Sequence, residues 1–125
     1  MNLKEWKKME RSKMFIHYER FESDWFKSVL NRLNFDQCPY PKTQYGMVEF
    51  LKKNDIRIEY ESSDLGWRYF GVDDKDRDSF TEDLEYYITF NDCANTAIVE
   101  CLCYLLNCIE GLYLCILLEF FLRIM

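Results

Sequence analysis

Apolar residues recur at helical spacing near the start of the chain. Leu3, Trp6 and Met9 share one face of an amphipathic helix predicted over residues 3–13. Residues 14–22 fit a continuation of this helix and an extended strand equally well. Both alternatives stay open at this stage.

Two further helices are predicted before the middle of the chain. Ser23 is a typical N-cap residue, and the helix after it should end before the two prolines of CPYP at 38–41. Thr43 is a second N-cap, and Asn54 is expected to end that helix with left-handed backbone. The residues predicted to face the core are Phe26, Val29, Leu30, Leu33, Met47, Phe50 and Leu51.

The period then changes from helical spacing to strict alternation. Residues 55–61 alternate apolar and charged side chains, which predicts a half-buried strand. A turn at 62–65 leads to a second, aromatic-rich strand at 66–72. An acidic loop at 73–83 precedes a third strand at 84–90. Short connections between consecutive strands favour an antiparallel meander.

The last segment, ECLCYLLNCIEGLYLCILLEFFLRIM at 100–125, is the most apolar of the chain. Three glutamates interrupt it, so it lacks the run of about 20 apolar residues that a membrane span needs. We expect a core helix and no membrane partner. Gly111 leaves open whether this is one helix or two, at 95–109 and 112–123. A homodimer through this helix is the alternative use of its apolar surface.

These elements predict an α+β fold. N-terminal helices and a small antiparallel β-meander would be covered by a long apolar C-terminal helix packed on the sheet. The 125 residues, 49% of them hydrophobic, fit a single domain over 1–125. Because no signal peptide precedes the first helix, we expect a cytoplasmic protein whose six cysteines stay reduced.

The cysteines of the last segment do not form a predicted metal site. Cys101, Cys108 and Cys115 are seven residues apart, which separates neighbours by about 10.5 Å along a helix. That distance is too long for a disulfide or for ligands of one zinc ion. We expect small buried apolar side chains, and no cofactor.

The sequence carries no recognisable catalytic motif. It has no Gly-rich phosphate loop, no GxSxG elbow and no HExxH helix. Its one histidine, His17, lies among apolar residues and has no spacing relation to a cysteine. We therefore predict no catalytic residue and expect that the protein is not an enzyme.

Charge is divided unevenly along the chain. Residues 1–57 carry a net +4, whereas residues 58–125 carry a net −10. Phosphate contact requires clustered Lys and Arg, so direct nucleic-acid binding is disfavoured. The acidic half favours a basic protein partner.

A candidate partner-binding surface follows from this acidic half. Its carboxylates are expected to gather at one end and edge of the sheet, beside aromatic side chains that could anchor a partner. On the third strand, the face of Glu85, Tyr87 and Thr89 is expected to lie outside. The predicted binding residues are Glu59, Glu61, Asp73, Asp74, Asp76, Asp78, Glu82, Asp83, Glu85, Trp67, Tyr69 and Tyr87.

The acidic loop also resembles the calcium loop of an EF-hand. A twelve-residue frame over 74–85 places Asp74, Asp76, Asp78, Glu82 and Glu85 at positions that supply oxygen ligands. Serine stands where the sharp turn needs glycine, and the flanks are predicted strands instead of helices. A small calcium-binding module is thus an alternative.

The acidic, reduced α+β profile, with RIEYESSDLGWRYFGV and LEYYITF leading to an apolar helix, resembles a class of bacterial proteins. These are the immunity proteins of contact-dependent inhibition and other polymorphic toxin systems. The resemblance implies stoichiometric inhibition, in which the acidic surface covers the active site of a basic, nuclease-like toxin. A phage-encoded inhibitor of a nucleic-acid-binding host protein is the alternative with the same charge mimicry.

Overall fold

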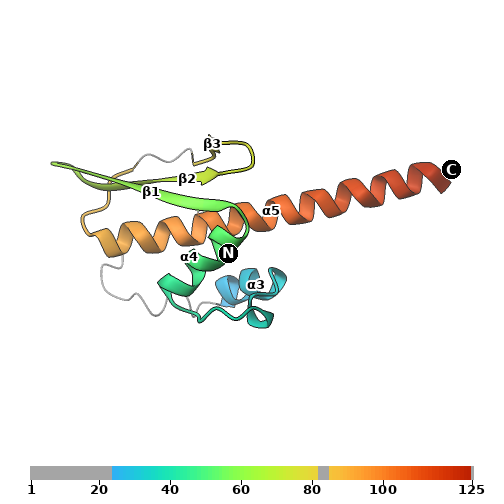
Figure 1. The fold of residues 1–125 in the computed structure, drawn as a ribbon, viewed down its shortest axis with the longest axis horizontal. Helices are drawn as coiled ribbons and strands as arrows, with labels where there is room; N and C mark the ends of the chain where they lie inside the picture. Colours follow the sequence, from blue (N-terminus) through green and yellow to red (C-terminus); the bar gives the residue numbers. More distant parts are fainter. Residues whose placement is uncertain (1–23, 82–84, 125) are drawn as a thin grey trace.

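A computed structural model describes residues 24–81 and 85–124 and has the predicted α+β arrangement (Figure 1). The helices and segments expected over 3–22 lie outside the described residues. The described elements are α3 (Asp24–Arg32), the short 3-10 helix η1 (Phe35–Gln37), α4 (Gln44–Lys53), β1 (Ile56–Ser63), β2 (Gly66–Asp73), β3 (Asp78–Ser79) and α5 (Phe90–Ile124).

The helices α3 and α4 form where periodicity predicted them. All seven of their predicted core residues are buried, with exposed fractions of 7% or less. The Thr43 hydroxyl accepts a hydrogen bond from the Gly46 amide at 3.1 Å, so it caps α4 as expected. The left-handed residue after α4 is Asp55 (φ 63°), not Asn54. Asn54 instead donates its side-chain amide to the Phe50 carbonyl at 2.9 Å.

The strands form a three-stranded antiparallel sheet in the order β1-β2-β3. The register pairs Ile58 with Gly71 and Tyr60 with Tyr69, so these four residues lie on the face toward α5. Gly66 closes the hairpin with φ 122°, and a Cβ there would lie 2.5 Å from the Tyr87 carbonyl oxygen. Only glycine fits this turn.

The predicted third strand at 84–90 is wrong. Tyr87 forms only an isolated bridge to Trp67, with N–H···O distances of 2.8 and 2.6 Å. Thr89 then caps α5 by accepting a hydrogen bond from the Asp92 amide at 3.2 Å, so helix begins at Phe90. The third strand of the sheet is β3, inside the segment expected to be loop.

The helix α5 is continuous from Phe90 to Ile124, so the two-helix alternative is wrong. Its first part packs between the sheet and the pair α3 and α4 (Figure 1). The core residues that it contributes are Cys93, Ala94, Ala97, Ile98, Val99, Cys101, Leu102, Leu105 and Leu106. Its last part extends beyond the other described elements (Figure 1).

Close approach of α5 to the sheet depends on Gly71. A Cβ at this position would lie 2.5 Å from the Phe80 ring and 2.9 Å from the Cys101 sulfur. The Phe80 ring is itself stacked on Tyr104, with centroids 3.7 Å apart and planes 5° apart. Because the ring is held on its other side, a larger residue would force the helix and sheet apart.

The buried part of α5 is also the described segment closest to a membrane span in length and composition. Residues Phe90–Gly111 are long and apolar enough to cross a membrane, but 61% of their most apolar stretch is buried inside the molecule. This segment therefore serves as a core helix, which is consistent with a soluble protein.

The described cysteines are all free thiols. Cys101 is buried as predicted. Cys93, for which burial was not predicted, is also buried, and burial raises the pKa of its thiol to about 12. Cys108 is exposed, contrary to the expectation of a buried stripe, because α5 has begun to leave the core at that point.

Candidate functional site

The acidic turn between β2 and β3 is the most carboxylate-rich exposed segment that the structure describes. Its chain reverses through Arg77, which has left-handed backbone (φ 58°) and donates its amide to the Asp73 carbonyl at 2.7 Å. The Asp73 carboxylate accepts the Lys75 amide at 3.0 Å. These bonds fix the turn and leave Asp74, Asp76 and Asp78 exposed.

Asp73 anchors this turn to α5 and is half-buried. The Tyr104 hydroxyl donates a 2.9 Å hydrogen bond to its carboxylate. Burial raises the pKa of Tyr104, and the bond to Asp73 raises it further. Because this carboxylate is already engaged within the chain, Asp73 is less available than the exposed carboxylates of the turn, and its contact with a partner stays a prediction.

Arg57 neutralises two of the predicted carboxylates. Its guanidinium donates to Asp74 at 2.8 Å and also pairs with Glu59. The hydrogen bond to Asp74, followed by that to Glu59, raises the pKa of Arg57. The three groups are about half-exposed, so water screens the pairs and they contribute little stability. They do reduce the negative potential at this edge of β1.

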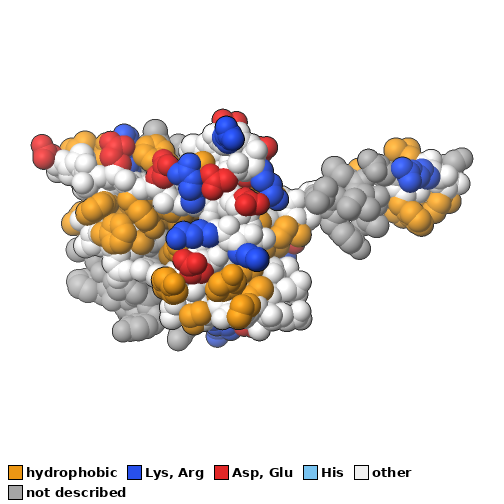
Figure 2. Space-filling view, viewed as in Figure 1, with side chains coloured by type: hydrophobic (Ala, Val, Ile, Leu, Met, Phe, Trp, Pro, Cys, Tyr) orange, Lys and Arg blue, Asp and Glu red, His pale blue; other side chains and the backbone are white. Residues whose placement is uncertain are grey.

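Asp76 and Asp78 carry the uncompensated charge. In the described ranges neither has an ion-pair partner, and both are exposed. Their basic neighbours in the turn are Lys75, which lies 4.0 Å from Asp55, and Arg77. Figure 2 shows acidic and basic side chains mixed along this upper edge of the molecule. The negative surface is thus smaller than the sequence predicted.

Glu61 lies apart from the acidic turn. It pairs with Arg68 across the sheet at 2.8 Å, near the β1–β2 hairpin end. Glu61 lies five residues along β1 from Ile56, which pairs with Asp73 beside the turn. Five residues of a strand span about 17 Å. The expectation that the carboxylates gather at one end of the sheet is therefore wrong, because β1 runs away from the turn.

Tyr69, predicted as a partner anchor, is a core residue with 1% of its surface exposed. Its hydroxyl donates to the Glu100 carboxylate on α5. Burial raises the pKa of Tyr69, and the neighbouring Glu100 charge raises it further. The prediction is wrong because α5 covers the face of β2 on which this ring lies.

The other two predicted aromatic anchors are half-buried. Trp67 contacts the Phe90 ring edge-to-face at 5.0 Å, and Tyr87 lies 6.1 Å from Tyr69. Tyr87 faces the core, whereas Tyr86 and Ile88 are exposed, the reverse of the prediction for these three residues; Thr89 is exposed as predicted. Glu85 is half-buried and has an interaction within the chain.

Exposed apolar side chains do gather near the β1–β2 hairpin, but they are not the predicted aromatic residues. Ile88 is 83% exposed and Leu65 72%, and Phe90 and Tyr86 are more than a third exposed. The Arg68 guanidinium lies 5.4 Å from the centre of the Tyr86 ring and 5.2 Å from that of Phe70. Sequence reasoning missed these residues because it assigned 84–90 to a strand of the opposite register.

The calcium alternative gains no support from the described part of the frame. No group of three or more His, Cys, Asp or Glu side chains there, or elsewhere in residues 24–81 and 85–124, is arranged to hold a metal ion. Glu82 and Asp83 lie outside the described residues. The segment before the frame is the strand β2, where an EF-hand has a helix.

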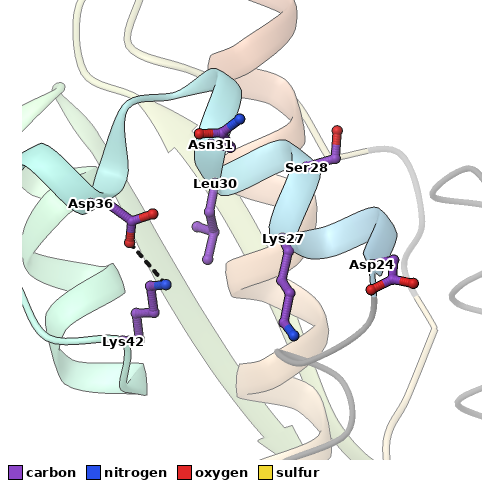
Figure 3. Close-up of a pocket in the computed structure, with 7 residues that line it drawn as sticks. All are labelled: Asp24, Lys27, Ser28, Leu30, Asn31, Asp36 and Lys42. Atoms are coloured by element: carbon purple, nitrogen blue, oxygen red, sulfur yellow. Dashed lines mark ion pairs between the residues drawn. The ribbon is translucent and has the colours of Figure 1, made fainter.

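A hollow of about 410 Å³ lies at the other side of the molecule, between α3 and the segment before α4 (Figure 3). Asp36 and Lys42 form a 2.8 Å ion pair at one side of it. Lys27 and Asp24 project from α3 at the other side (Figure 3). This lining combines opposite charges and contains no histidine or thiol.

Comparisons of the chain with protein-family models, with curated proteins and with solved structures gave no match in any of the three.

Proposed function

We propose that this chain is an immunity-type protein of the bacterial cytoplasm that binds a basic, nuclease-like toxin and inhibits it by covering its active site. One observation carries the proposal. The turn between β2 and β3 holds Asp74, Asp76 and Asp78 exposed on a rigid base, and two of the three have no ion pair in the described residues. Carboxylates held this way can occupy sites that bind substrate phosphates.

The rigid base matters because a preordered surface loses less entropy on binding. The turn is held by its backbone bonds, by the pairing of β3 with β2 and by the bond from Tyr104 to Asp73. Exposed apolar side chains, Ile88 and Leu65 among them, lie at the other end of the sheet, near the β1–β2 hairpin. They can supply contact area once charge has guided the partner into place.

The test compares two variants with the same change in net charge. The first neutralises the turn with Asp74→Asn, Asp76→Asn and Asp78→Asn. The matched control neutralises Asp24, Asp36 and Glu49 as Asp24→Asn, Asp36→Asn and Glu49→Gln, which lie on the α3 and α4 side. The probe is the basic protein that co-purifies with the wild-type chain from its host, which we expect to be encoded directly upstream.

The turn variant should associate with that protein about tenfold more slowly at low salt, and its rate should depend less on salt than that of the wild type. The control should associate within about twofold of the wild-type rate. The wild type should also abolish the partner's nuclease activity at a one-to-one ratio. Equal rates and equal salt dependence for all three proteins would refute the acidic-turn proposal.

A further inference from the structure

The last two turns of α5 expose large apolar side chains in the part of the chain that the structure describes. Leu118, Phe120, Phe121, Leu122 and Ile124 are each 58% to 69% exposed. At its root, a Cβ added to Gly111 would meet no atom within 4 Å. Figure 2 shows apolar side chains and one basic patch on this projecting part. A helix with this composition is normally covered by another surface.

We propose that a second copy of this chain covers it, with the two α5 extensions (residues 110–124) packed antiparallel about a two-fold axis. Charge favours this occupant. The charged residues of the extension are Glu110 at its root and Glu119 and Arg123 near its tip. Antiparallel packing brings each Arg123 to the level of the other copy's Glu110, whereas parallel packing would align like charges and place two net-negative bodies side by side.

The contact face is set by helical spacing. Glu110 and Ile124 are two heptads apart, and Phe120 precedes Ile124 by four residues, so the three lie on one face. Arg123 flanks this face, and Leu122 points away from it. The Glu110 side chain, paired with Arg32 of its own chain, keeps 42% of its surface exposed and can receive a second cation.

The size of this face predicts a weak dimer. Burial of one aromatic side chain removes about 150–250 Å² of surface from water. Each of the two copies contributes Phe120, Phe121 and Ile124 to the interface. The total is on the order of 1,000 Å², at the lower end of specific interfaces. Dissociation in the micromolar range is therefore expected.

A lipid bilayer is the other surface that could cover an apolar helix. It is disfavoured because residues 111–124 span only about 20 Å, short of the roughly 30 Å hydrocarbon layer. The chain also carries a net charge of −6, which anionic lipid headgroups repel. The experiment includes vesicles for this reason.

The test measures the molar mass of the full chain by sedimentation velocity from about 1 to 200 µM. The wild type should shift from monomer to dimer across this range. Small-angle scattering at 200 µM should show a long particle with the two bodies, meaning the sheet and the helices packed on it, at opposite ends. Phe120→Glu and Ile124→Glu should each weaken association at least tenfold. The matched control Leu122→Glu, on the opposite face, should dimerise within about threefold of the wild type.

Three outcomes would overturn the proposal. The first is a monomer at all concentrations, whether or not the chain then sediments with phosphatidylcholine vesicles. The second is equal loss of dimerisation in the control Leu122→Glu, which would mean nonspecific association. The third is a dimer whose two bodies lie side by side. Circular dichroism of each variant confirms that the body remains folded.

Discussion

The two halves of α5 have similar composition and opposite surroundings. From Cys93 to Leu106 the helix contributes nine buried hydrophobic residues, whereas its last part leaves large apolar side chains exposed. The difference comes from what lies beside the helix. The sheet covers one side of the first half, and α3 and α4 cover the other, while these elements end before the second half begins. Hydropathy alone therefore does not decide burial in this chain.

The largest contrast between the halves should come from leucine truncation. Leu102 is fully buried, so Leu102→Ala should lower the free energy of unfolding by about 2–5 kcal/mol. Leu122 is 69% exposed, so Leu122→Ala should change it by less than about 0.5 kcal/mol at low micromolar concentration. Urea unfolding measures both. Similar losses at the two positions would show that the last part of α5 packs within its own chain.

A pair of glycine substitutions sharpens the same contrast. Gly71→Ala should destabilise the fold by about 1–3 kcal/mol, because the added methyl meets the Phe80 ring and the Cys101 sulfur. Gly111→Ala meets no atom within 4 Å and should stabilise the helix by about 0.5–1 kcal/mol. Thermal unfolding of the two variants should thus move in opposite directions. A stabilised Gly71→Ala would contradict the close approach of α5 to the sheet.

The bond from Tyr104 to Asp73 ties the packed half of α5 to the acidic turn. Tyr104→Phe removes a donor from a part-buried carboxylate and should cost about 1–2 kcal/mol. Because the folded-state pKa of Tyr104 is above its ordinary value of 10.0, its stabilising contribution is complete below pH 10 and is lost at higher pH. The variant should lose less stability than the wild type above pH 10.

The control for this variant is Tyr45→Phe, at a tyrosine that is 73% exposed. It should leave the alkaline part of the stability profile unchanged. Equal alkaline sensitivity of Tyr104→Phe and the wild type would place the titrating groups elsewhere in the chain.

A smaller effect than at Leu102 is expected at the start of the packed half. Thr89→Ala removes the hydroxyl that caps α5 and should cost about 1 kcal/mol. Thr89→Ser keeps the hydroxyl and should recover most of that loss. Chemical unfolding of the two variants measures the difference, and identical stabilities would mean that the cap contributes nothing.

Local signals explain which parts of the fold could be predicted. The helices α3 and α4 follow from apolar spacing and from the Thr43 cap, and the β1–β2 hairpin follows from alternation. The prediction of a strand at 84–90 was wrong because its run of aromatic and apolar residues is typical of a strand although it pairs with the sheet only at Tyr87. The pattern TFND at 89–92 was the missed signal, since a threonine followed three residues later by an acid is typical of a helix start.

The candidate site was less predictable because burial depends on tertiary contacts. Alternation correctly placed Glu59 and Glu61 on the outer face with Arg57. It could not show that Arg57 would pair with Glu59 along β1 and that Arg68 would pair with Glu61 across the sheet. Nor could it show that α5 would cover the ring of Tyr69. Both facts depend on strand register and on which sheet face the helix occupies.

Hydrogen exchange along α5 at two protein concentrations tests the central contrast most directly. Amides of residues 94–106 should exchange with the free energy of global unfolding, at a rate that does not depend on concentration. Amides of residues 112–124 should be weakly protected at 1 µM and more strongly protected at 200 µM, because a second copy covers them. Strong protection of 112–124 that is the same at both concentrations would contradict the account.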